Sequence, residues 1–263
     1  MTEIKRHEPG MFCWVELATK DGPAAKKFYT SLFDWGVNDI PSEAGTYSMV
    51  QKKGKDAGAL YELGREQQGV PSHWNSYVCV ESADDTAAKA KNLGGTIALG
   101  PFDVMEHGRM AIIQDPTGAT FSIWQPKEHR GAQVINEPGS FCWNELYTTD
   151  PKRAGDFYSN LFDWSRELMP MPPPTGEYTI FKKGDAQAAG MLKIAKEMGP
   201  APPHWMVYFA VEDSDKTVEN AKRMGGTVTV PPMDIPNIGR FAILNDPQGA
   251  DFAVIRLEQR QQT

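Results

Sequence analysis

The sequence repeats itself once, and this repeat limits what the chain can fold into. The segment FCWVEL at 12–17 returns as FCWNEL at 141–146, and FYTSLFDW at 28–35 returns as FYSNLFDW at 157–164. A spacing of 129 residues with only two copies is unlike a solenoid, which stacks many short repeats. We therefore predict that the chain is one domain duplicated in tandem.

The remainder of the chain follows the same order in both copies. The offset grows to 131 residues after the second copy inserts a proline-rich turn at 169–176. The polar stretch 127–137 has no periodic apolar pattern and is typical of a linker. We predict a first module at 1–129 and a second at 130–263. Further repeated pairs are His73-Trp74 with His204-Trp205, Gly94-Gly95-Thr96 with Gly225-Gly226-Thr227, Gly108-Arg109 with Gly239-Arg240, and Asp115-Pro116-Thr117-Gly118 with Asp246-Pro247-Gln248-Gly249.

Hydrophobic periodicity predicts the elements of each copy. Asp21 before Gly22-Pro23 suits the start of an amphipathic helix that ends near Phe33. A second helix is expected at 84–93, closed by Gly94-Gly95. Strands are expected at 12–17, 47–52, 57–63, 75–80, 110–114 and 120–125. Strands and helices in this order indicate an α+β module.

Composition excludes several classes of protein. The formal net charge of −7 argues against a nucleic-acid partner, because such binding normally requires a basic face. No apolar run reaches the roughly 18 residues that a membrane helix needs. The first ten residues lack the apolar core of a signal peptide. We therefore expect a cytoplasmic protein with neither a nucleic-acid nor a membrane partner.

Three local motifs accompany this order of elements. Each copy has Ala-x-x-Phe-Tyr-x-x-Leu-Phe on its first helix (25–33 and 154–162), Gly-Gly-Thr after the second helix, and Asp-Pro-x-Gly before the last strand. In these motifs the chain resembles the vicinal oxygen chelate superfamily of glyoxalases, bleomycin-resistance proteins and extradiol dioxygenases. Within it, the chain is similar to two-module actinobacterial proteins described as glyoxalase-like or hydroxylase-like antigens.

The resemblance carries expectations about architecture. It implies that each module pairs two βαβββ motifs and curls its strands into a cup that holds a small ligand or a metal. It also implies that the two modules pack against each other as a pseudo-dimer. We expect a compact monomer or a weak homodimer.

The resemblance also locates the positions that bind metal in the family's enzymes. These positions fall at Trp14, Asn75 and Ser122 in the first copy, and at Trp143, Met206 and Ala253 in the second. Tryptophan, methionine and alanine are not ligands for a divalent ion, and asparagine and serine replace imidazole and carboxylate poorly. We therefore predict no metal and no other cofactor, and a divalent metal remains the disfavoured alternative.

Strand alternation adds candidates to this set, because residues two apart share a face. Glu16 shares a face with Trp14, and His73 and Tyr77 share one with Asn75. A Glu16–His73 pair is the candidate catalytic couple, as acid and base or as an unusual metal site, and the alternative is a purely structural role. The remaining candidate ligand-binding residues are Trp124, Glu145, His204 and Tyr208.

The arginines and tryptophans at these positions have either a structural role or a role in ligand binding. Arg109 and Arg240 each follow a glycine at a strand start and either form salt bridges or clamp an anion at the mouth of a cup. Trp14, Trp124 and Trp143 either fill the cups or form an aromatic wall for a flat ligand.

Three functions follow from these residues. The first is binding of a small aromatic or amphipathic molecule without a metal. The alternatives are a lyase, isomerase or hydroxylase-like enzyme that uses the Glu/His pair, and an interaction protein with filled cups. Since Asn75 and Ser122 are replaced by Met206 and Ala253, we expect the first cup to be the more selective site and the second to be filled or more apolar.

Overall fold

The computed structural model describes residues 3–42, 45–67, 69–171, 176–196, 199 and 201–258. Part of the predicted proline-rich turn, at 172–175, and the outer ends of both predicted modules, at 1–2 and 259–263, lie outside the described residues. None of the described helices has the length and apolarity that a membrane-spanning helix needs.

Both modules have the same order of strands and α-helices. The first contains β1 (Phe12–Thr19), α1 (Gly22–Phe33), β2 (Gly36–Ser42), β3 (Gly45–Lys52), β4 (Lys55–Glu62), the 3₁₀-helix η1 (Arg65–Gln67), β5 (His73–Cys79), α2 (Ala83–Asn92), β6 (Thr96–Val104), β7 (Gly108–Gln114) and β8 (Thr120–Pro126). The second contains β9 (Phe141–Thr148), α3 (Pro151–Phe162), β10 (Ser165–Pro170), β11 (Glu177–Lys183), β12 (Ala186–Lys193), β13 (His204–Ala210), α4 (Ser214–Arg223), β14 (Thr227–Ile235), β15 (Gly239–Asn245) and β16 (Asp251–Leu257).

Each module forms its own eight-stranded sheet. The strand order is β2-β3-β4-β1-β5-β8-β7-β6 in the first and β10-β11-β12-β9-β13-β16-β15-β14 in the second. The first strand lies at the centre of each sheet, antiparallel to β5 or β13 and parallel to β4 or β12. The predicted α+β class with two βαβββ motifs per module is confirmed.

One strand in each half-motif was not predicted from the sequence. In the first module these are β2 and β6, which lie at the two edges of the sheet. Both contain proline, and β6 has no fully buried residue. Edge strands are paired on one side only and tolerate proline and exposure, so they lack the alternation that identifies an inner strand.

The first helix of each module begins and ends at aspartates. Asp21 and Asp150 accept hydrogen bonds from backbone amides in the first turn, and each helix has proline there. Asp34 and Asp163 adopt the left-handed conformation that ends the helix. These caps fix the helices so that their aromatic residues face inward.

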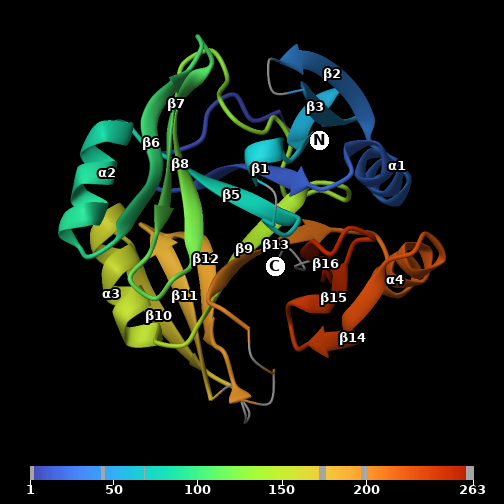
Figure 1. Ribbon diagram of the computed structural model, residues 1–263. Coiled ribbons are helices and arrows are strands. Elements are labelled where there is room, and N and C mark those ends of the chain that lie inside the picture. The colour runs from blue at the N-terminus through green and yellow to red at the C-terminus, as the bar shows by residue number, and fades with distance from the viewer. Residues whose placement is uncertain are drawn as a thin grey trace.

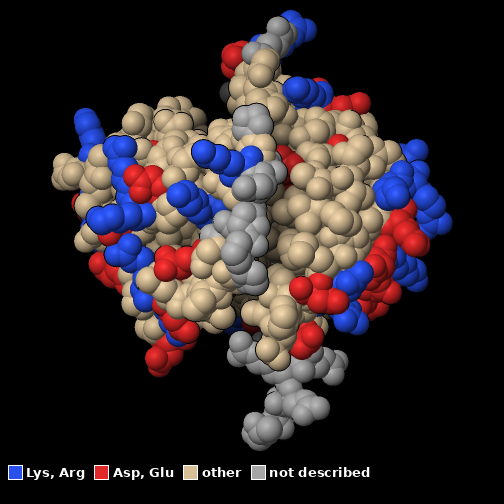
Figure 2. Space-filling view, turned by 90° about the horizontal axis from the view of Figure 1, so that it is seen from below, with Lys and Arg blue, Asp and Glu red and all other residues tan. Residues whose placement is uncertain are grey.

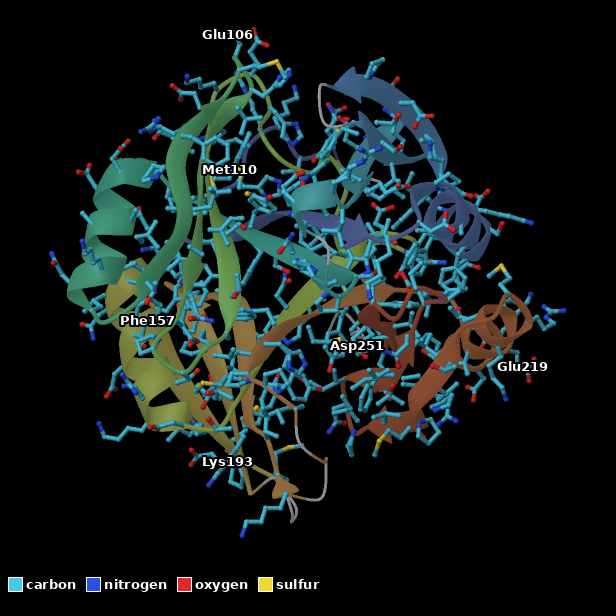
Figure 3. The ribbon with its side chains drawn as sticks, in the orientation of Figure 1. Glu106, Met110, Phe157, Lys193, Glu219 and Asp251 are labelled. Carbon is cyan, nitrogen blue, oxygen red and sulfur yellow. The ribbon has the colours of Figure 1, made fainter. Side chains whose placement is uncertain are left out.

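Those aromatic residues pack across the module boundary. Tyr29 and Phe33 of α1 contact Phe252 of the second module's β16. By the same symmetry, Phe121 of β8 contacts Tyr158 and Phe162 of α3. Figure 1 shows the first module above the second, with α2 beside α3 and α1 beside α4. Figure 3 shows Phe157 of α3 at this boundary.

Hydrogen bonds repeat across the same boundary. The Tyr29 hydroxyl donates to Oδ2 of Asp246, 3.0 Å away, and accepts from Nε1 of Trp74. The indoles of Trp35 and Trp164 donate to backbone carbonyls of Gly139 and Gly10, respectively, in the segments that lead into the opposite module's first strand. The two modules therefore share one core, and the predicted compact pseudo-dimer is confirmed.

The 127–137 segment packs against the first module. The amides of Ala132 and Gln133 donate to the carbonyls of Cys13 and Asp56. Ala132 and Val134 are almost completely buried. The polar composition predicted a linker, but these contacts hold the segment along the first sheet.

Substitution of Phe252 or Phe121 by alanine should test the shared core. Each change removes a buried ring that contacts the other module's helix, so we expect each to reduce the free energy of unfolding by about 3–5 kcal/mol. Urea denaturation should still show a single transition for the whole chain. Two separate transitions, with only the substituted module destabilised, would contradict a shared core.

Candidate functional site

Strand pairing gathers the candidate residues on one face of each sheet. In the first module, Trp14 lies opposite Tyr77, and Tyr77 pairs in turn with Ser122. Glu16 lies opposite Asn75 in the next row. Both sets of paired residues thus lie on the inner face of the curved sheet. This face is called the first cup below. Figure 3 shows Met110, which pairs with Trp124, in the same sheet.

Glu16 is held by tyrosines in the first cup. The Tyr77 hydroxyl donates to Oε1 of Glu16 at 2.5 Å, and the Tyr47 hydroxyl donates to Oε2 at 2.8 Å. The indole Nε1 of Trp14 donates to the Tyr47 hydroxyl at 3.2 Å. Both carboxylate oxygens therefore have partners, and Glu16 is 8% exposed.

The second cup repeats this arrangement atom by atom around Glu145. The Tyr208 hydroxyl donates to Oε1 of Glu145 at 2.8 Å, and the Tyr178 hydroxyl donates to Oε2 at 2.6 Å. Trp143 Nε1 donates to the Tyr178 hydroxyl at 3.0 Å. Gly190, beside Glu145 in the neighbouring strand, leaves the space that the Tyr178 hydroxyl occupies in this cup, since a Cβ there would overlap it.

Burial controls the protonation of both clusters. It raises the pKa of Glu16 and Glu145, and the tyrosine hydrogen bonds act in the opposite direction. Burial and the charge of Glu16 raise the pKa of Tyr77 and Tyr47 well above the usual value. The tyrosines therefore keep their protons and act as donors to the carboxylates.

A third tyrosine enters each cup from a different strand. Tyr61 of β4 faces the first cup, where the charge of Glu16 and, to a larger degree, burial raise its pKa. In the second cup the hydroxyl of Tyr147 of β9 lies 3.4 Å from the Tyr208 hydroxyl, which donates to Glu145. The sequence reasoning missed Tyr47, Tyr61, Tyr147 and Tyr178. The repeat could have identified Tyr47 and Tyr178, because they occupy equivalent positions.

His129, which the sequence reasoning also missed, covers the first cup. Its ring lies 4.5 Å from that of Trp14 and 5.7 Å from that of Trp124, and its carbonyl accepts from the Trp124 indole. Trp14 is only 3% exposed beneath it. The hydroxyl of Ser122, on the floor of this cup, is buried with no hydrogen-bond partner in the described part of the chain.

The second cup is apolar and more open. Its buried lining forms a cluster separate from the main core, with partly exposed residues around it. Trp143, unlike Trp14, is partly exposed. Figure 2 looks from below toward the second module and shows a broad uncharged area on the side of β14–β16, with charged groups along its outer edge. The cluster consists of Tyr147, Met206, Tyr208, Ile243, Ala253 and Ile255, with Cys142, Trp143, Leu192, Ile194, Val230 and Phe241 packed against them.

The remaining candidates lie farther from the glutamates. His73 and His204 each contact a proline carbonyl two residues earlier, and the His204 ring also stacks on Tyr147. Arg109 forms ion pairs with Asp84 and Asp103. Arg240 pairs with Asp215 and Asp234 in the same way. Both arginines thus bridge the second helix of their module to strands, outside the tyrosine clusters.

The side chains at the family's metal positions do not fit a metal. Trp14 fills one of them in the first cup and Trp143 in the second, and neither side chain is a ligand. The carboxylate at the centre of each cup has both oxygens occupied by tyrosine hydroxyls. Among the described residues, no group of three or more histidines, cysteines or acids is placed to hold an ion.

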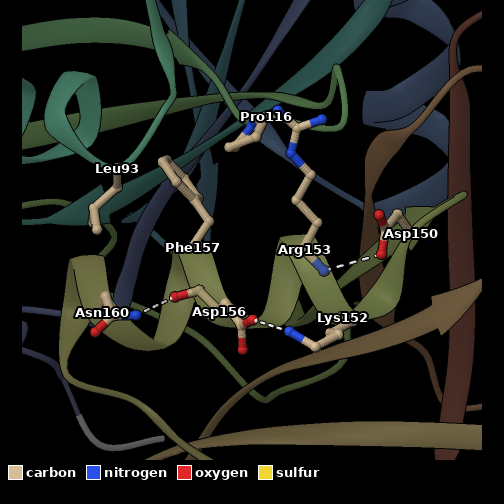
Figure 4. A pocket seen from close by; sticks show the side chains of 8 residues that line it. All are labelled: Leu93, Pro116, Asp150, Lys152, Arg153, Asp156, Phe157 and Asn160. Carbon is tan, nitrogen blue, oxygen red and sulfur yellow. Dashed lines mark hydrogen bonds and ion pairs between the residues drawn. The ribbon is translucent and has the colours of Figure 1, made fainter.

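A cavity of about 340 Å³ lies elsewhere, between the modules. It is lined by Phe157, Arg153 and Asp150 of the α3 region and by Leu93 and Pro116 of the first module. Figure 4 shows Lys152 paired with Asp156, and Asp150 accepting a hydrogen bond from the backbone amide of Arg153. It does not contain either tyrosine cluster.

Replacement of His129 by glutamine should reduce the acid sensitivity of the protein. Burial lowers the pKa of His129 to about 4, so the folded state favours the neutral ring. The resulting stability is present above about pH 6.5 and is lost as pH falls toward 4, by up to about 3 kcal/mol. Urea denaturation between these pH values should show a smaller loss for His129→Gln than for the wild type. His107→Gln, at an exposed position, is the control, and an unchanged loss in His129→Gln would contradict the placement of His129.

Comparison with known proteins places these cups in a family. The model of the "Glyoxalase/Bleomycin resistance protein/Dioxygenase superfamily" matches residues 12–123 and 140–254. The glyoxylase-like protein CFP32 of Mycobacterium tuberculosis is 40% identical over 99% of this chain and 100% of its own length. The anthracycline biosynthesis protein DnrV of Streptomyces peucetius is 35% identical over 97% of this chain and 96% of its own.

A solved structure shares the fold at much lower identity. The Mn(II)-bound glyoxalase from Novosphingobium aromaticivorans superposes with a TM-score of 0.66 at 14% identity, over 95% of this chain and 83% of that one. The family match covers both modules, and the fold agrees with it. The chain therefore belongs to the glyoxalase/bleomycin resistance protein/dioxygenase superfamily.

Proposed function

We propose that the protein binds a small aromatic or amphipathic molecule in its cups without using a metal. The observation that carries this proposal is the apolar lining of the second cup, which surrounds a hydrogen-bonded carboxylate and is separate from the core. Ligand sites are typically apolar concavities with a few placed polar groups. The similarity to DnrV, a protein named for anthracycline biosynthesis, supports an aromatic ligand.

The two cups differ in access. Trp143 is partly exposed, whereas Trp14 is buried under His129. We therefore assign the second cup as the site that a ligand enters directly. The first cup, with the unpartnered hydroxyl of Ser122, is the more selective site and becomes accessible when His129 moves.

An enzymatic role is the second candidate. In the second cup the His204 ring stacks on Tyr147, whose hydroxyl contacts the Glu145 cluster. This arrangement could pass a proton between Glu145 and a ligand through tyrosine hydroxyls. Metal analysis separates the candidates: protein purified without chelator should contain far less than one first-row metal ion per chain, and a stoichiometric ion would favour a metal enzyme.

A thermal-shift screen with planar phenols and quinones should test ligand binding. A ligand present at about 100 times its Kd adds about 2.7 kcal/mol to the stability of the folded state. For a chain of this size that corresponds to roughly 5–10 °C in Tm. Trp143→Leu should abolish the shift, and Trp14→Leu, at the equivalent covered position, is the matched control. If no compound raises the Tm, the cups are filled and the proposal fails.

A further inference from the structure

The glutamate at the centre of each cup is a buried acid without a cationic partner. No lysine, arginine or histidine forms an ion pair with Glu16 or Glu145 in the described part of the chain. Their oxygens are satisfied by neutral tyrosine hydroxyls alone. Buried charges in proteins are normally paired with an opposite charge, because hydrogen bonds offset only part of the desolvation cost.

Aromatic rings surround this acid in the second cup. Trp143, Tyr147, Tyr178 and Tyr208 are all joined to Glu145 directly or through one hydroxyl. Tyr147, Tyr208 and Trp143 also belong to the apolar lining. The π faces of tyrosine and tryptophan attract cations, and a carboxylate behind them adds to the same negative potential.

The direction of the hydrogen bonds also favours a ligand that carries a hydrogen-bond donor. Tyr178 and Tyr208 donate their protons to Glu145. Lone pairs of the hydroxyl oxygens therefore remain to accept from a ligand N–H, although the Trp143 indole already uses one on Tyr178. The cluster thus presents hydrogen-bond acceptors to the space inside the cup.

We propose that the second cup recognises the ammonium group of an organic cation, such as an amine-bearing aromatic molecule, through its tyrosine and tryptophan rings and the charge of Glu145. This inference rests on the proposed ligand-binding function and specifies the class of ligand. The aromatic part of the ligand contacts the apolar lining around Phe241 and Ile255.

A pair of isosteric probes isolates the charge. 3-Hydroxyphenyltrimethylammonium and 3-tert-butylphenol have nearly the same shape and differ by one positive charge. Calorimetric titration at about pH 7 keeps most of the phenol of both probes protonated, so that the cationic probe retains its net charge. We expect the cation to bind wild-type protein about tenfold more tightly than its neutral isostere.

Matched variants assign this preference to one cup. Glu145→Gln keeps the shape and removes the charge, so the preference for the cation should fall to about twofold or less while the neutral probe binds as before. Glu16→Gln makes the same change under His129 and should retain the preference. A preference that survives Glu145→Gln, or that both variants reduce equally, would overturn the assignment to the second cup.

Two further outcomes keep the two proposals distinct. If both probes bind equally to the wild type, the cups bind aromatic molecules but the inference about ammonium is wrong. If neither probe binds, both proposals fail. Should Glu145→Gln not fold, a change from about 0.05 M to about 0.5 M NaCl serves instead, because a buried carboxylate is screened far less than surface charge. Loss of the preference at high salt would then overturn the inference.

Discussion

Packing of aromatic side chains across the module boundary is the interaction on which the rest of the structure depends. Each sheet has one face covered by helices and strands of both modules, through contacts such as Tyr29 with Phe252 and Phe121 with Tyr158. The opposite face of each sheet makes none of these contacts between the modules and forms a cup. The cups can therefore hold polar groups that a core could not tolerate without partners.

The polar group at the centre of each cup is a carboxylate. Hydrogen bonds from tyrosine hydroxyls offset part of the cost of burying it. Charge-assisted hydrogen bonds from hydroxyls are strong in a low-dielectric setting and hold the rings in fixed positions. In this way Glu145 orients Tyr178 and Tyr208, which in turn form the wall of the second cup. A metal site would need those carboxylate oxygens, which the tyrosine hydroxyls already occupy.

Duplication preserved this cluster and changed its surroundings. The acid, two tyrosines and one tryptophan keep the same hydrogen bonds in both copies. The third tyrosine comes from β4 in one cup and from β9 in the other. His129 covers only the first cup among the described residues, and Gly190 replaces Ala59 at the paired position of the second. These differences leave the first cup covered and the second more open.

The sequence by itself determined the duplication, the inner strands and the helices, because apolar periodicity and aspartate caps are local signals. It also placed Glu16 with Trp14 and Tyr77 with Asn75, since alternation along a strand is local too. It missed the edge strands, which lack that alternation.

Only the tertiary structure brought Tyr47 to Glu16, and only it placed His129 over Trp14, because both contacts join segments that no local pattern relates. The Asp-Pro-x-Gly motif shows the same limit. The sequence identified it as a turn, yet Asp246 also accepts a hydrogen bond from the Tyr29 hydroxyl of the other module. That second role depends on how the two copies pack, which is a property of the complete fold.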